Sequence, residues 1–193
     1  MKNIVYVVLL ALPVALIGCA GSNKEKQPYD KDLEAQVSKI HRGEYLVTIA
    51  GCGDCHTPKV MTAQGPQPDM ERYLSGYNAN NPLGEYDTTL AQSGRWALFS
   101  GEMTAAAGPW GVSFAANLTP DGTGLGNWSL ENFRTALRKG KYKGIESSRP
   151  LLPPMPWQNY AQFSDQDIEA IFEYLKSIKP VENLVPQAIA PKM

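Results

Sequence analysis

Gly51-Cys52-Gly53-Asp54-Cys55-His56-Thr57-Pro58 is the segment around which this chain of 193 residues is organised. Two residues separate Cys52 from Cys55, and His56 follows directly, a spacing typical of c-type haem attachment. Two thiols one helical turn apart can each bond a vinyl group of the same porphyrin, and the next residue then directs an imidazole at the iron. The segment therefore predicts one covalently attached haem c with His56 as an iron ligand.

Two other interpretations of the cysteine pair are weaker. A thiol redox centre places the pair after a strand, at the N-terminus of a helix, whereas residues 41–50 have a helical pattern. A structural zinc site needs four ligands, and the three cysteines and two histidines do not follow zinc-finger spacings. Cys19 is assigned to lipid below, so two cysteines remain for the porphyrin and none for a disulfide.

Residues 1–18 are predicted to be a lipoprotein signal peptide. Lys2 precedes an apolar run, Ile4 to Ile17, which is short for a membrane-spanning helix and fits the core of a secretory signal. The end of the run, Leu16-Ile17-Gly18-Cys19, resembles the bacterial lipoprotein cleavage box, which implies cleavage before Cys19 and its lipidation. The alternative is an uncleaved anchor. Either way the body is expected outside the cytoplasm, in the periplasm or at the cell surface, where c-type haem is attached.

The charge of the chain argues against nucleic acid as a partner. Once Lys2 is removed with the signal, 17 of the 18 basic residues remain against 19 acidic ones. A chain this close to neutrality is not expected to form a basic surface for a phosphate backbone. Membrane contact is expected through the lipid on Cys19. Residues 19–31 are polar, lack apolar periodicity and are predicted to be a flexible tether.

Three principal helices are predicted in the domain that covers residues 32–181. The first spans Leu33 to Ile49, and its Gly43, which lowers helix propensity, is expected to allow another backbone to approach. The second spans Leu130 to Lys139 and has Ser129 as its N-cap. The third starts after Ser164 and stops before Pro180, and its Tyr174 is a candidate to cross near Gly43.

The remaining segments are predicted to be irregular. Residues 57–127 form a long loop-rich insertion, whose short apolar pieces fit either a small β-hairpin or a lining for the haem crevice. Residues 149–157 contain four prolines, which remove N–H donors and fix φ, so this segment is expected to be extended and stiff. Residues 182–193 are expected to be a frayed C-terminal tail.

Met155 is the favoured second axial ligand, because the thioether of methionine suits haem iron. Prolines flank it in Pro153-Pro154-Met155-Pro156-Trp157, so its sulfur is expected to be positioned before iron is bound. The alternative is that Met155 fills the core, and Met103 is the reserve ligand. Three further residues are disfavoured because they lie close in sequence to His56: His41, Met61 and Met70.

Several linked motifs resemble a class I cytochrome c domain. They are Arg42-Gly43-Glu44-Tyr45-Leu46 before the cysteine pair, Asn117-Leu118-Thr119-Pro120-Asp121, Gly126-Asn127-Trp128-Ser129, Pro153-Pro154-Met155-Pro156-Trp157 and Tyr174-Leu175-Lys176-Ser177. The chain is similar in particular to the domains repeated in multihaem cytochrome subunits of membrane-bound alcohol, aldehyde and nicotinate-type dehydrogenases. This resemblance implies an all-α cytochrome c fold with His56 and Met155 as axial ligands. Those subunits carry several attachment motifs, whereas this chain has one.

The resemblance implies one-electron transfer between redox protein partners rather than catalysis. Three alternatives remain open: a cytochrome subunit of a dehydrogenase complex, a peroxidase-like or sulfur-compound-oxidising haem enzyme, and a haem-based sensor. Candidates for the apolar crevice are Trp110, Phe114, Trp157 and Tyr160. Candidates for contacts with the haem propionates are Asn117, Arg138 and Lys141.

Overall fold

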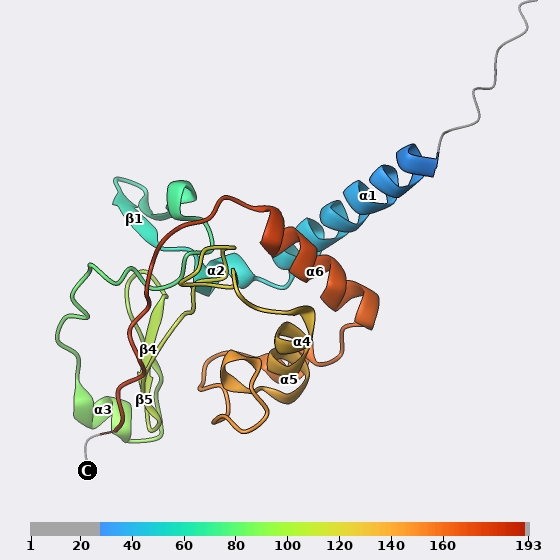
Figure 1. The fold of residues 1–193 in the computed structure, drawn as a ribbon. Coiled ribbons are helices and arrows are strands. Elements are labelled where there is room, and N and C mark those ends of the chain that lie inside the picture. The colour runs from blue at the N-terminus through green and yellow to red at the C-terminus, as the bar shows by residue number, and fades with distance from the viewer. Residues whose placement is uncertain (1–27, 192–193) are drawn as a thin grey trace, which may run out of the picture.

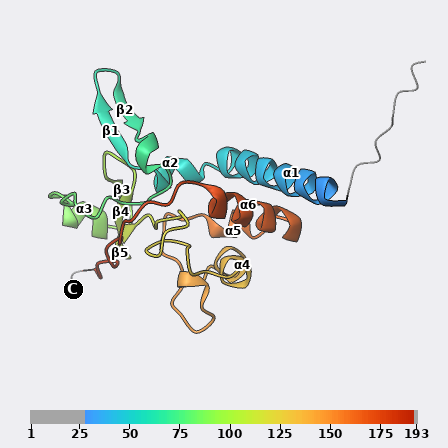
Figure 2. The same cartoon turned by 45° about the horizontal axis from the view of Figure 1, so that its top comes forward.

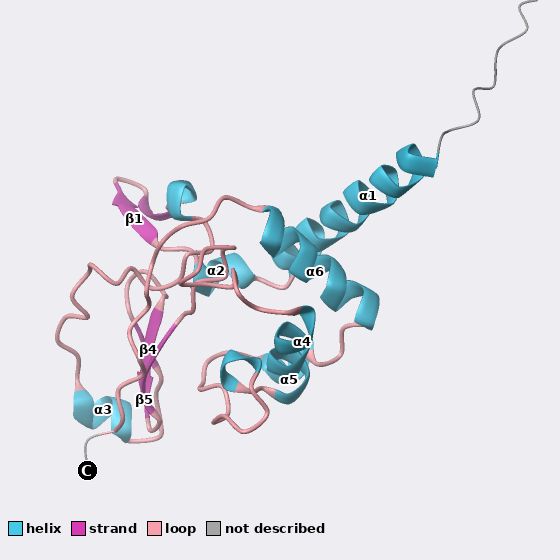
Figure 3. Ribbon diagram, in the orientation of Figure 1, coloured by secondary structure: helices cyan, strands magenta, loops and turns pink. Residues whose placement is uncertain are grey.

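The computed structural model describes residues 28–191, so the predicted signal peptide and Cys19 lie outside the described residues. Helices α1, α4 and α6 lie on one side of the molecule, and the strands and α3 lie on the other (Figures 2 and 3). The elements in chain order are α1 (Pro28–Ile49), α2 (Cys52–His56), β1 (Lys59–Thr62), β2 (Gly65–Pro68), η1 (Met70–Arg72), α3 (Thr88–Gln92), β3 (Leu98–Phe99), β4 (Ala105–Gly108), β5 (Gly111–Phe114), α4 (Leu130–Lys139), η2 (Tyr142–Gly144), α5 (Trp157–Tyr160) and α6 (Asp165–Ser177).

Helices α1 and α6 pack against each other (Figure 1). They approach at Gly43, as the sequence predicted. A Cβ atom at this position would collide with the carbonyl oxygen of Ala170 and lie 2.7 Å from Cβ of Tyr174. Only a residue without a side chain allows this approach, which explains why a residue of low helix propensity stands here.

The core lies where α1, α4 and α6 meet. Its buried apolar side chains contact one another and exclude water: Leu46, Val47, Leu74, Leu125, Phe133, Leu137, Ile168, Ile171, Phe172 and Leu175. Cys52 and Met155, which are 103 positions apart in the sequence, both pack against this cluster. The helical core therefore carries both segments that were predicted to bind the iron.

The ends of α4 and α6 follow the capping signals in the sequence. The side chain of Ser129 accepts a hydrogen bond from the backbone N–H of Asn132, and Gly140 ends α4 in the left-handed region at φ 61°. Ser164 caps α6 in the same way. The predicted bounds of α4 are confirmed, because its caps supply the partners that the terminal backbone groups need.

Helix α1 begins earlier than predicted, at Pro28, so part of the segment expected to be a tether is helical. Its first turns extend away from the body (Figure 1). Leu33 and Val37 are about half exposed there. Among residues 28–191, no helix combines the length and the apolar character needed to span a membrane.

The insertion contains more strand than the single hairpin that the sequence suggested. Strands β1 and β2 pair as an antiparallel hairpin that projects from the body (Figure 2). Strands β3, β4 and β5 form a second antiparallel sheet in the order β3-β4-β5. All four residues of β4, Ala105 to Gly108, are buried. Such small residues carry a weak apolar signal, which is why the pattern did not reveal this sheet.

Residues 181–191 form an extended segment, here called the C-terminal strap, which runs back along the sheet to α3 (Figure 1). Ile189 exchanges both backbone hydrogen bonds with Val112 of β5, at 2.8 and 2.9 Å. Asn183 donates to the carbonyl oxygens of Ser75 and Tyr77. The expectation of a frayed tail is therefore wrong for residues 182–191, because side-chain and backbone bonds, which leave no periodic pattern, fix the strap.

Candidate haem-binding site

Helix α2 places both cysteines on one face. It is a single turn, entered from Gly51 in the left-handed region at φ 68° and left at Thr57 in an extended conformation. Cys52 and Cys55 are free thiols, both partly buried, and their spacing of three residues puts them one above the other on the helix surface. This arrangement presents two sulfur atoms to one ligand, as the sequence predicted.

Two hydrogen bonds from the insertion hold His56 in place. The Nδ1 atom of its imidazole lies 2.7 Å from the carbonyl oxygen of Ala116, and the backbone carbonyl of His56 accepts a hydrogen bond of 2.7 Å from the backbone N–H of Gly76. A carbonyl can only accept, so Nδ1 carries the proton and Nε2 keeps its lone pair. This is the arrangement by which proteins orient a histidine that binds metal.

Burial keeps the three groups of the attachment segment neutral. Burial lowers the pKa of His56, although its bond to Ala116 opposes the shift. Burial raises the pKa of Cys52 to about 11 and also raises that of Cys55. At pH 7 the segment therefore presents a neutral imidazole, the form that binds iron, beside two protonated thiols.

Lys59 completes the end of α2, a role that sequence reasoning missed. Its Nζ donates to the carbonyl oxygens of Asp54 and Thr57 at 2.5 and 2.9 Å. Carbonyls at a helix C-terminus lack partners within the helix, and a cation there also favours the helix dipole. The signal available in the sequence was a basic residue three positions after the last helical residue.

Met155 faces a hollow of about 260 Å³ whose lining comes from its own segment, Leu151 to Gln158. The segment is not the single extended strand that was expected, because it turns at Pro153 and Pro154 and enters α5 at Trp157. Met155 lies between the turn and the helix, half-buried against the core. Met155 thus lies at the edge of an open space.

The other candidate axial ligands are on the surface. The exposed fractions of Met61, Met70 and Met103 are 76%, 66% and 42%. The side chain of His41 is 71% exposed, and its Nδ1 lies 3.7 Å from a carboxylate oxygen of Glu44. Among the candidate methionines and histidines of the described residues, His56 is buried and Met155 packs half-buried against the core.

The residues suggested for the crevice and for propionate contacts are engaged with protein groups. Tyr160 donates to the carbonyl oxygen of Ala50 just before the attachment segment, at 2.8 Å, and the ring of Trp157 packs against Gly140. Asn117, Arg138 and Lys141 donate respectively to the carbonyl oxygens of Val181, Ala161 and Ser148. These three side chains hold the fold together, so the expectation that they face a propionate gains no support.

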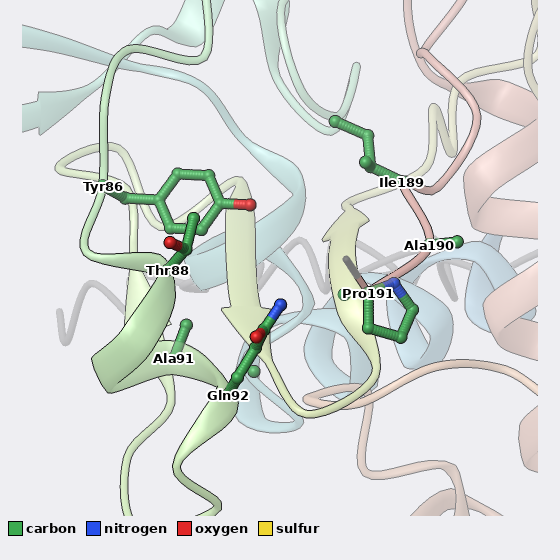
Figure 4. Close-up of a pocket in the computed structure, with 9 residues that line it drawn as sticks. Tyr86, Thr88, Ala91, Gln92, Ile189, Ala190 and Pro191 are labelled. Atoms are coloured by element: carbon green, nitrogen blue, oxygen red, sulfur yellow. The ribbon is translucent and has the colours of Figure 1, made fainter. Parts of the chain in front are cut away.

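A second cavity lies between α3 and the C-terminal strap (Figure 4). Tyr86, Thr88 and Gln92 line it from one side, and Ile189 and Pro191 from the other. Its volume of about 20 Å³ holds about one water molecule. It is therefore a packing gap rather than a site for a cofactor.

The residues present fit a covalently bound haem. The donor set comprises two adjacent thiols, an imidazole whose Nε2 keeps its lone pair, and the thioether of a methionine that lines a hollow, and Cys52 and Met155 pack against the same core. Imidazole and thioether are the axial pair of electron-carrying haem proteins. The chemistry of the site therefore agrees with the attachment motif.

Comparison with known proteins identifies relatives over most of the chain. Residues 40–179 match the family model described as Cytochrome c. The chain is 28% identical over 176 residues to the fructose dehydrogenase cytochrome subunit of Gluconobacter japonicus, and 30% over 162 residues to the alcohol dehydrogenase (quinone) cytochrome c subunit of Gluconobacter oxydans. It is 30% identical over 152 residues to the gluconate 2-dehydrogenase cytochrome c subunit of Pantoea cypripedii.

The matched regions are unequal shares of the proteins compared. They cover 89%, 82% and 78% of this chain but only 28%, 26% and 26% of those three relatives. The chain therefore spans about a quarter of the length of each relative.

Proposed function

The chain belongs to the cytochrome c family and carries one covalent haem c at Cys52, Cys55 and His56, and from this we propose that it transfers single electrons between redox proteins. The haem supplies reversible one-electron oxidation and reduction of its iron. The protein supplies the two thioether attachments and both axial ligands. The observation that carries the proposal is that His56 is buried with its Nδ1 bonded to Ala116 and that Met155 packs against the core, while the other candidate ligands are exposed.

His56 is the proposed proximal ligand and Met155 the proposed distal ligand. The bond from Nδ1 of His56 to Ala116 supports the first assignment, because it directs Nε2 away from the insertion. The half-buried position of Met155 beside an open hollow supports the second. With protein groups at both axial positions, the iron has no open place for a substrate, which favours a carrier over an enzyme.

The names of the relatives support a more specific role as the cytochrome subunit of a dehydrogenase complex. All three are cytochrome subunits of dehydrogenases. In this role the chain would accept electrons from a catalytic subunit and pass them to another redox protein. A stand-alone carrier between a dehydrogenase and a respiratory complex is the second candidate, and the single attachment motif favours it.

A membrane-tethered location outside the cytoplasm is part of the proposal. Its support is in the sequence: an apolar run from Ile4 to Ile17 and the lipoprotein-like box that ends at Cys19. Covalent attachment of haem c also takes place outside the cytoplasm. Mass analysis of the native protein tests this directly, because lipidation removes residues 1–18 and adds acyl chains to Cys19.

The haem ligands are tested by spectroscopy of the full-length holoprotein. Ferric cytochromes c with a methionine ligand have a weak long-wavelength absorption band, which we expect here and which Met155→Ala should abolish. The reduction potential should fall by a few tenths of a volt, within the roughly 0.8 V that axial ligands span. Met103→Ala is the matched control and should leave both unchanged.

Three outcomes would contradict the proposal. Protein matured in a cell competent for haem attachment could lack added porphyrin on the cysteine pair, which would remove its basis. A five-coordinate resting spectrum would instead favour the haem enzyme. Tight binding of carbon monoxide by the unaltered ferrous protein would favour the sensor.

A further inference from the structure

The hydroxyl of Ser113 links the insertion to the segment that carries Met155. Ser113 lies on β5, and its Oγ donates to the carbonyl oxygen of Pro153 at 2.6 Å, across 40 residues of sequence. Pro153 precedes Met155 by two residues. We propose that Ser113 is a positioning residue for the Met155 sulfur, an inference that rests on the proposed role of Met155 as distal ligand.

The Met155 segment depends on partners for its carbonyl groups. Three of the five residues from Leu152 to Pro156 are prolines, which have no N–H to donate. The segment is held at its start by the N–H of Leu151, which donates to Gly140, and at its end by a local bond within α5. The bond from Ser113 acts between these two points, two residues before Met155.

The direction of the Ser113 hydroxyl is determined by its neighbours. It has one proton and two carbonyl acceptors, Pro153 at 2.6 Å and Ala106 at 3.3 Å, so the shorter contact takes the proton. Nε1 of Trp110 donates to Ser113 Oγ at 3.3 Å. The Trp110 ring is packed against Gly108, where a Cβ would collide with it. This chain of donors polarises the bond to Pro153.

The strand that carries Ser113 is braced on both sides. Ser113 pairs with Ala106 of β4 in the sheet register. The preceding residue, Val112, is 1% exposed and exchanges two hydrogen bonds with Ile189 of the C-terminal strap. The anchor of the Met155 segment is therefore an edge strand whose outer side is bridged by the strap at Val112.

Holding the segment in place favours ligation by methionine over competing ligands. A thioether that is already positioned loses little conformational freedom on binding iron, whereas a loose one binds with lower effective affinity. Removing one intramolecular hydrogen bond corresponds to a factor of about 2–10 in an equilibrium constant. We therefore expect weaker retention of the methionine ligand without the hydroxyl.

The test is displacement of the methionine ligand by imidazole in the ferric holoprotein. The measured signal is the loss of the long-wavelength absorption band. Ser113→Val and Ser113→Thr have nearly the same shape, suit a strand equally and differ in the hydroxyl. The imidazole concentration at half-displacement should fall about 2- to 10-fold in Ser113→Val and stay near that of the native protein in Ser113→Thr. Ser100→Ala removes a different hydroxyl contact of the same sheet, from the N–H of Ala105, and should have no effect.

The outcomes separate this inference from the proposed function. Equal half-displacement in Ser113→Val and Ser113→Thr overturns the role of the hydroxyl, and so does an equal shift in Ser100→Ala. If Ser113→Val does not fold, Ser113→Ala removes the same hydroxyl, and an unchanged half-displacement there also overturns the role. Retention of the band in Met155→Ala would instead overturn the assignment of the distal ligand.

Discussion

The carbonyl oxygen of Ala116 lies 2.7 Å from Nδ1 of His56, although sixty residues separate the two in the sequence. The insertion therefore returns to the attachment segment and supplies the partner that orients its imidazole. A hydrogen bond from Nδ1 to a carbonyl makes the imidazole a stronger electron donor through Nε2. The reduction potential of the site should depend on this one backbone contact.

Gly76→Ala tests this dependence without replacing a ligand. Gly76 has φ +80°, and a Cβ there would lie 2.6 Å from the carbonyl carbon and oxygen of Ala116, so this carbonyl must leave its present position. Loss of the bond should raise the reduction potential by roughly 20–60 mV, the one-electron equivalent of one hydrogen bond. Gly84→Ala is the matched control, because Gly84 has φ +75° but no atom within 4 Å of its Cβ position. Equal potentials in a redox titration of the two variants would refute the argument.

Gly43→Ala should destabilise the protein although it raises helix propensity. In an exposed helix the change would add about 0.5–1 kcal/mol of stability. Here the new Cβ would collide with the backbone of Ala170, and overpacking of this kind costs about 1–3 kcal/mol. The free energy of unfolding of the holoprotein in guanidinium chloride decides which effect wins. A variant as stable as the native protein would mean that α1 and α6 can separate freely.

Asn183→Ala should release the C-terminal strap. The Asn183 amide donates to Ser75 and Tyr77, and its oxygen accepts from the N–H of Ala79, so three backbone groups lose a partner. We expect a loss of about 1–3 kcal/mol and faster amide hydrogen exchange in residues 181–191. The neighbouring Leu184→Ala removes a side chain that is 73% exposed and should change neither. Unchanged exchange in Asn183→Ala would show that pairing with β5 alone holds the strap.

Asp167→Asn should lower stability at neutral pH but not in acid. The hydrogen bond from the Arg42 guanidinium, at 2.9 Å, holds the pKa of Asp167 below its ordinary value. A depressed carboxyl pKa contributes stability above the unfolded pKa of about 3.9, which is lost as the pH falls through the folded pKa. The difference in unfolding free energy between the native protein and the variant should therefore shrink below about pH 4. Arg42→Gln should give the same pH dependence. The double variant should lose little more unfolding free energy than either single variant. If the two losses add in full, Arg42 and Asp167 do not stabilise each other.

The helical core could be predicted because its signals are local. Ser129 and Gly140 mark the ends of α4 within one turn of the helix, and Gly43 and the attachment segment are defined by residue type and spacing. The α1–α6 crossing could be predicted for a similar reason. A glycine inside a helix indicates that another backbone packs closely there, even though the sequence does not show which one.

The rest of the site could not be predicted because it depends on long-range backbone contacts. Ala116 orients His56 through its backbone carbonyl oxygen, and Pro153 accepts the hydrogen bond from Ser113 through its backbone carbonyl oxygen. Every residue type has a backbone carbonyl, so residue identity does not reveal these contacts. The sheet of β4 was missed because Ala105 to Gly108 give no alternating apolar pattern. The axial role of Met155 stays a prediction.

Helix α1 also has a mechanical consequence. Its 22 residues form a stiff rod about 33 Å long, and its C-terminal half contacts α6 through Lys39, Arg42 and Gly43. If its far end is held at a surface, the body can move by swinging on an arc rather than by stretching, and a tilt of about 20° at Pro28 would carry it sideways by roughly 11 Å. The angle of that rod would then decide which neighbours the iron can approach.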